Sequence, residues 1–161
     1  MKRDLYYVEL VNFDYYDEVD DENVESRYGI GYFTDEKIKN EAIELCKARK
    51  EEGEKIVITK YTLDLNYNQK YIYVLLYEYS IEDNEEYTDY YYRFEPMNNP
   101  KKCLEYKQKI CNEPRYRDDG NRIFYDTPDG FYIEKAKINM IVHINYRIKA
   151  ERANEIPETP D

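Results

Sequence analysis

The feature that most constrains the fold is an internal repeat, because residues 5–65 and 70–140 contain the same order of predicted elements. Each segment has an apolar strand, an acid-rich turn, a Tyr-rich strand, an amphipathic helix and a closing strand. A copy of about 70 residues buries little surface and would be marginal alone, so we expect the copies to share a core or a continuous sheet. The alternative is two similar domains that barely touch. The sequence predicts an α+β protein of two tandem β-β-α-β repeats, mostly antiparallel sheet, with one helix packed on one face of each repeat and a pseudo-two-fold arrangement.

The two predicted helices each follow a residue that favours a helix start. Thr34 and Asn99 have side-chain oxygens that can accept from unpaired N–H groups of the first turn, and Pro100 suits the first helical position. Apolar residues follow at helical spacing. The stripes are Ile38, Ala42, Leu45 and Cys46 in the first helix, and Cys103, Leu104, Ile110 and Cys111 in the second. The three cysteines are predicted to be small buried hydrophobic residues in a reducing compartment.

Two short motifs resemble a known family. Residues 29–36, Gly-Ile-Gly-Tyr-Phe-Thr-Asp-Glu, run into the first helix, and residues 128–133, Pro-Asp-Gly-Phe-Tyr-Ile, open the last strand. Together they are similar to a family of small uncharacterised bacterial and phage domains of the β-β-α-β kind. The first copy keeps the strand-to-helix half of that pattern and the second keeps the Asp-Gly-Phe half. The resemblance implies a fold and no activity.

The repeat also sets the expected domain boundaries. Residues 1–68 form the first predicted repeat and residues 69–145 the second. Residues 146–161 are expected to be a C-terminal extension that is partly disordered, because its end is acidic and contains two prolines.

Charge limits the classes of partner. The net charge is −11, from 35 acidic and 24 basic residues. Such a surface repels nucleic-acid phosphates and anionic membranes, so neither direct nucleic-acid binding nor membrane binding is expected. The chain shows no secretory hydrophobic segment and no apolar run close to the ~20 residues of a membrane span, which predicts a cytoplasmic protein.

Both repeats concentrate acids and tyrosines in the region between their first two strands. The chain has 21 tyrosines and no tryptophan. Clustered carboxylates steer association with basic proteins, and tyrosines supply interface area at low entropic cost. The sequence therefore predicts a binding site for a basic protein. The target class that we expect is nucleases and other nucleic-acid-binding proteins. The acids would inhibit such a protein by occupying the positions where nucleic-acid phosphates bind. The predicted site residues are Asp14, Tyr15, Tyr16, Asp17, Glu18, Asp20, Asp21, Glu22, Glu82, Asp83, Glu85, Glu86, Tyr87, Asp89, Tyr90, Tyr91 and Tyr92.

Three other interpretations of these residues remain open. The acids and tyrosines are also compatible with solubility and biased composition alone. The acids near residues 17–25 offer oxygen ligands for a cation, but they lack the glycine and spacing of a known calcium loop, so no metal site is predicted. A cleft between the repeats is the alternative binding site, for a small ligand, with Arg27 and Arg93 as candidates to contact phosphate. Surface salt bridges to neighbouring acids are the simpler explanation of both arginines.

Catalytic motifs are absent from the sequence. The single histidine, His143, lies in an apolar segment, and Ser26 and Ser80 have no glycine-flanked elbow. Paired zinc ligands and phosphate-binding glycine loops are also missing. We therefore expect a binding protein that is not an enzyme and needs no cofactor.

Overall fold

The computed structural model describes residues 1–17, 22–83, 86–112, 115–116, 122–123, 130–142 and 150–157. Within these residues the protein is α+β, with antiparallel sheets and two helices. The chain divides into two compact units. The first unit contains residues 1–70 and 137–148, and the second contains residues 71–136 and 149–161.

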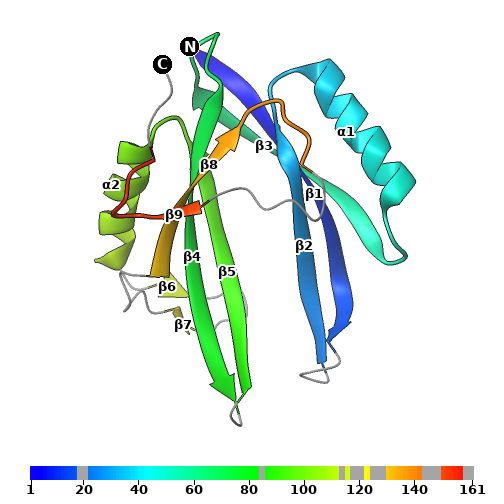
Figure 1. Cartoon of the computed structure of the whole chain (residues 1–161), viewed down its shortest axis with the longest axis vertical. Helices are drawn as coiled ribbons and strands as arrows, with labels where there is room; N and C mark the ends of the chain where they lie inside the picture. Colours follow the sequence, from blue (N-terminus) through cyan, green and yellow to red (C-terminus); the bar gives the residue numbers. More distant parts are fainter. Residues whose placement is uncertain are drawn as a thin grey trace. The chain divides into compact units, whose positions relative to one another are not determined.

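The described part of the first unit is a three-stranded sheet with one helix (Figure 1). Its elements are β1 (Lys2–Asp17), β2 (Glu22–Phe33), α1 (Glu36–Arg49) and β3 (Glu54–Asp64). The order in the sheet is β2-β1-β3, and β1 runs antiparallel to both neighbours. One face of the sheet packs on α1, where Val8 and Leu10 of β1 contact Ala42 and Cys46 of the helix.

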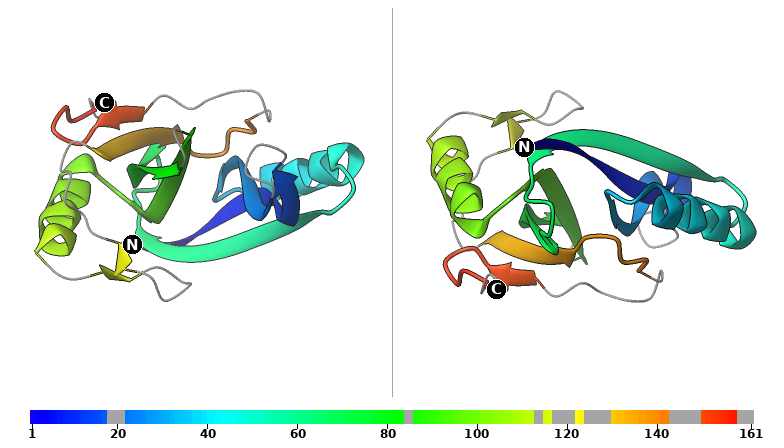
Figure 2. Two further views of the ribbon diagram at one scale, coloured as in Figure 1. Left: turned by 90° about the horizontal axis from the view of Figure 1, so that it is seen from below. Right: turned by 90° about the horizontal axis from the view of Figure 1, so that it is seen from above.

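The second unit has a similar order of elements with additions after its helix. It contains β4 (Tyr71–Asp83), β5 (Glu86–Met97), α2 (Pro100–Cys111), β6 (Arg115–Tyr116), β7 (Arg122–Ile123), β8 (Phe131–Lys137) and β9 (Ala150–Arg152). The main sheet has the order β5-β4-β8-β9, while β6 and β7 form a separate small pair. Figure 2 shows α2 beside this sheet, and its residues Cys103 and Ile110 pack with Tyr73, Leu75 and Phe131.

Both central strands are buried on two faces. In β1 the residues Leu5, Val8, Leu10 and Val11 are all buried, and β4 has the same continuous burial from Ile72 to Leu75. A strand buried on both faces needs a near-continuous apolar run instead of alternation. This requirement explains why the first strands of the two segments have no polar face in the sequence.

Helix starts agree with the sequence at α2 and differ at α1. Asn99 is the N-cap of α2 and accepts from the N–H of Lys102 at 3.0 Å, with Pro100 in the first turn, as predicted. In α1 the N-cap is Asp35, which accepts from the N–H of Ile38 at 3.0 Å, so the prediction of Thr34 is wrong. The Thr34 hydroxyl instead accepts from the Asn139 side chain.

Residues 137–142 complete the first unit from far along the chain. The backbone N–H groups of Asn139 and Val142 donate to Tyr32 and Ile30 of β2 at 2.8 and 2.7 Å. Ile141 packs on the core beneath α1. Gly31 is required here, because a Cβ at that position would lie 2.5 Å from the Met140 carbonyl oxygen. The glycine in the Gly-Ile-Gly motif thus permits close approach of this segment.

The cysteines differ from expectation at one position. Cys46 and Cys103 are buried, as predicted for the helix stripes, but Cys111 is exposed at the end of α2. Burial raises the pKa of the Cys103 thiol to about 12, so this thiol stays protonated at neutral pH.

The C-terminal extension is described for residues 150–157. Its strand β9 pairs with β8, and the backbone N–H of Ala153 donates to the Phe131 carbonyl at 2.9 Å. Ala153 and Pro157 are buried. This part of the extension therefore packs as an element of the second unit.

We predict that replacing Tyr73 with Phe stabilises the second unit. Tyr73 is only 1% exposed, and its hydroxyl has no hydrogen-bond partner among the residues that the structure describes. An unsatisfied buried hydroxyl costs roughly 1–3 kcal/mol, so its removal should raise the free energy of unfolding by about 1 kcal/mol. Chemical denaturation measures the change, and Tyr67→Phe is the control because Tyr67 is 86% exposed. A loss of stability in Tyr73→Phe would show that the hydroxyl is satisfied.

Candidate protein-binding site

The acid-rich segments are strands for most of their length, so their prediction as turns is wrong. Strand β1 continues to Asp17 and β2 starts at Glu22, while β4 continues to Asp83 and β5 starts at Glu86. Two long hairpins result. In each, the helix packs near the open end, and the closed end extends beyond it (Figure 1). We call residues 14–25 and 79–91 the acidic hairpin ends.

The predicted site residues divide between these strands and their connections. Those in β1 are Asp14, Tyr15, Tyr16 and Asp17, and Glu22 begins β2. Those in β4 are Glu82 and Asp83, and those in β5 are Glu86, Tyr87, Asp89, Tyr90, Tyr91 and Tyr92. The connections hold Glu18, Asp20, Asp21 and Glu85, which lie outside the described residues.

Like charges lie opposite each other where each hairpin closes. Asp17 pairs with Glu22 in the first hairpin, and Asp83 pairs with Glu86 in the second. Carboxylates directly opposite across two strands repel each other and destabilise the pairing. Neither acidic hairpin end contains a Lys or Arg to offset this repulsion. The arrangement costs folding free energy at the same place in both units.

Tyrosines lie behind the second acid pair. Tyr79 is opposite Tyr90, and Glu82 is opposite Tyr87, in the register of β4 and β5. Aromatic cross-strand pairs stabilise a hairpin, which offsets part of the repulsion between the acids. Tyr92 is 40% exposed, and its ring centre lies 4.7 Å from that of Phe94. In the register of this hairpin, tyrosines and acids therefore occupy neighbouring positions.

Arg27 and Arg93 each bind a buried carboxylate of their own unit. Arg27 donates to Glu9 at 3.0 Å, and Arg93 makes two bonds to Glu134, at 2.8 and 3.1 Å. Glu9 and Glu134 are 6% and 4% exposed. A phosphate at either arginine would compete with a buried carboxylate that needs its cation.

These two glutamates were not identified from the sequence. Each follows apolar residues in its strand, Glu9 lying between Val8 and Leu10 and Glu134 coming directly after Ile133. A buried charge needs a partner, so an isolated Glu in an apolar run together with an Arg on another strand is the signal that could have found them.

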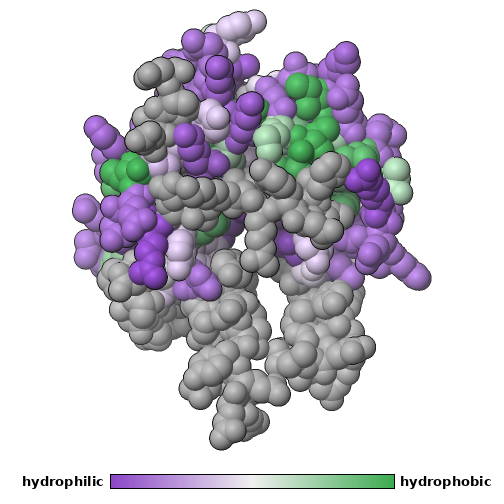
Figure 3. All heavy atoms as spheres, in the orientation of Figure 1, coloured by the Kyte–Doolittle hydropathy of each residue, from purple (hydrophilic) through white to green (hydrophobic). Residues whose placement is uncertain are grey.

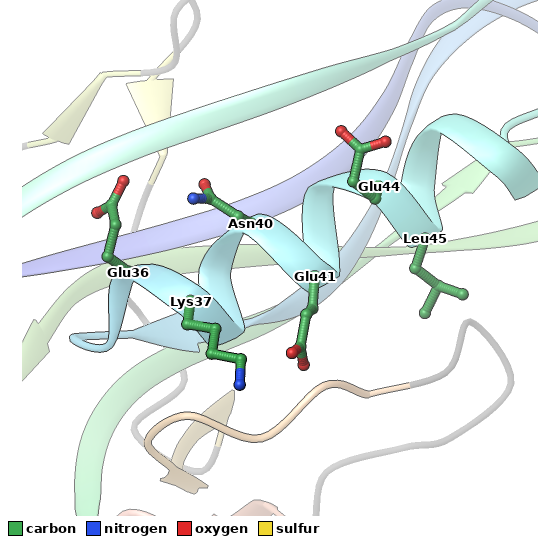
Figure 4. A pocket seen from close by; sticks show the side chains of 6 residues that line it. All are labelled: Glu36, Lys37, Asn40, Glu41, Glu44 and Leu45. Atoms are coloured by element: carbon green, nitrogen blue, oxygen red, sulfur yellow. The ribbon is translucent and has the colours of Figure 1, made fainter.

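A shallow depression on α1 is the remaining candidate. Figure 4 shows that its lining residues all come from this helix, with Lys37, Glu41 and Leu45 on one side and Glu36, Asn40 and Glu44 on the other. The space-filling view shows mainly hydrophilic residues over the coloured surface, with an apolar patch in the region of α1 (Figure 3). Because the lining carboxylates diverge and no second element contributes, the depression lacks the convergent polar groups of a ligand site.

The described residues contain no metal-binding cluster and no membrane-spanning helix. Within these ranges, no group of three His, Cys, Asp or Glu side chains could hold an ion. None of the helices there is long and apolar enough to cross a membrane. Comparisons with protein-family models, curated proteins and solved structures give no match.

Proposed function

We propose that the protein binds a basic protein through its acidic hairpin ends. The observation that supports this most directly is the acid-opposite-acid register at both ends, Asp17 with Glu22 and Asp83 with Glu86. In the free protein such pairs do not stabilise the hairpin, whereas a Lys- or Arg-rich partner relieves their repulsion on binding. The tyrosines of the second hairpin would add apolar contact area beside the charges.

The chemistry fits inhibition of a nucleic-acid-handling protein better than a catalytic role. A nucleic-acid channel is lined with Lys and Arg that bind phosphates, and an acidic hairpin presents carboxylates at closely spaced positions. Because net charge steers encounter, a protein with charge −11 should associate rapidly with such a channel. We propose this role for a protein acting in the cytoplasm.

We also propose that the units are diverged β-β-α-β copies with a pseudo-two-fold relationship, related to the family that the sequence resembles. The support is a shared irregularity in the hairpins. The register shifts after Val8 in the first hairpin and after Val74 in the second, in each case near the start of the repeated segment. Bulges have defined local roles and are seldom placed by chance.

Affinity capture from a lysate of the source cells tests the proposed function. The native protein is compared with a bait in which Asp17, Asp20, Asp21, Glu85 and Glu86 are changed to Lys. We expect a basic protein to be retained by the native bait and lost by the variant. A second bait makes the same change of net charge at five exposed acids outside the hairpin ends and should retain the partner; its substitutions to Lys are at Glu36, Glu41, Glu44, Glu51 and Glu52. Retention of no specific protein by the native bait would contradict the proposal.

Substitutions at the same site should raise stability and weaken binding. Asp17→Lys and Asp83→Lys replace a repulsive cross-strand pair with an attractive one, so each should raise the free energy of unfolding by about 0.5 kcal/mol. Each should at the same time weaken capture of the basic partner. Denaturant titration measures the first effect. Loss of both stability and binding would instead indicate that the hairpin had been disrupted.

A further inference from the structure

Among the described strands, the outer edge of β5 has a stretch that lacks the proline, lysine and bulge found along other edges. Strand β5 is at the end of its sheet, and β4 is its one neighbour among the described strands. From Glu86 to Tyr91 the register with β4 runs without a bulge, and the sequence contains no Pro, Gly or Lys. Proline, lysine and bulges are the usual devices that prevent an edge from pairing with another strand.

Such devices occur on the other long edges. Further along β5 itself, the register shifts opposite Val74–Leu76 and Pro96 follows. The register of β2 shifts opposite Asn12–Tyr15, and residues 137–142 bond to Ile30 and Tyr32 further along this strand. Strand β3 has exposed Lys55 and Lys60. Within the described part of the chain, residues 86–91 are therefore an edge stretch that has none of these devices.

The composition of residues 86–91 favours strand pairing and selects the charge of the partner. Its Tyr and Thr residues have high β-propensity. Glu86 and Asp89 disfavour pairing with a second copy, since an antiparallel pair centred on Asp89 places two aspartates opposite each other. A segment containing Lys or Arg meets attractive pairs at the same positions.

We propose that β5 receives an extended basic segment of the partner protein as an added strand at residues 86–91. This inference rests on the proposed function and specifies how the partner is held. Backbone hydrogen bonds supply affinity in this mode of recognition, and the acids select basic side chains.

Amide hydrogen exchange followed by NMR tests the inference, with a short peptide of alternating Lys and Val as the probe. Strand addition should slow exchange by about tenfold or more at alternate amides within residues 86–91, because only every second N–H faces the new strand. A peptide of the same sequence with alternate backbone nitrogens methylated keeps the charge but loses the donors. We expect this peptide not to bind.

Matched variants at one position check the charge preference. Thr88→Lys should weaken peptide binding and Thr88→Glu should strengthen it, each by about threefold to tenfold. Strand addition would be overturned if the methylated peptide bound equally well, if neither peptide bound, or if protection did not alternate along residues 86–91. The proposed function would then still be decided by the capture experiment. Protection that appears without peptide and grows with protein concentration would identify a second copy as the occupant and would also overturn it.

Discussion

Replacing Arg93 with Met should lower the free energy of unfolding by about 3 kcal/mol, the largest effect expected from any single change considered in this protein. The substitution leaves Glu134, which is 4% exposed, without the guanidinium that makes two bonds to it. The value lies at the low end of the range for buried pairs because the Arg93 side chain is 32% exposed. Urea titration measures the loss.

Substitution of Glu134, which pairs with Arg93, should lower the free energy of unfolding by a smaller amount. Glu134→Gln keeps an oxygen that can accept from Arg93, and the guanidinium is accessible to water, so we expect a loss of about 1 kcal/mol. Adding Glu134→Leu to Arg93→Met removes the buried charge and should recover much of the lost stability. A double variant no more stable than Arg93→Met alone would contradict this account of the pair.

Replacing Asn139 with Ala should destabilise the first unit by about 2–3 kcal/mol. The Asn139 side-chain oxygen accepts from the N–H groups of Thr34 and Asp35, both at 2.9 Å, and its amide donates to the Thr34 hydroxyl at 3.0 Å. Its backbone also has a φ of 60°, which Asn tolerates better than Ala. The substitution therefore loses three hydrogen bonds and adds backbone strain.

Two further variants separate these contributions. Asn139→Gly accepts the positive φ but loses the side chain, so it should cost about 1–2 kcal/mol. Asn139→Asp keeps the acceptor for both N–H groups, and the Thr34 hydroxyl can donate to it, so its cost should be about 0.5 kcal/mol or less. The predicted order of stability is Asp above Gly above Ala. Ala and Asp variants of equal stability would show that the side chain does not hold the start of α1.

Local sequence signals were sufficient to predict a helix start where the interactions that fix it are local. The N-cap at Asn99 and the proline after it were predicted because one residue supplies the acceptor and the next fits the first turn. At α1 the adjacent Thr34 and Asp35 are both capping residues. The choice of Asp35 depends on Asn139, which is more than a hundred residues away and has no signal in the local sequence.

The prediction that the acid-rich segments are turns was wrong for a related reason. Asp and Glu have low strand propensity, so their runs suggested connections between strands. The register shows instead that cross-strand partners, such as Tyr79 with Tyr90, extend the second hairpin through its acids. Pairing energy depends on which residues lie opposite, and this requires the register that the sequence alone does not supply. The Glu134–Arg93 pair was not predicted for the same reason, because the sequence does not supply the arrangement of the strands.

The most direct test of the central claim is the association rate of the captured partner as a function of ionic strength. If the acidic hairpin ends steer binding, the rate constant should fall by about tenfold or more between about 50 and 200 mM salt. The variant with both hairpin ends changed to Lys should show a low rate that depends little on salt. An unchanged rate and salt dependence in that variant would contradict the claim that the acidic hairpin ends bind the partner.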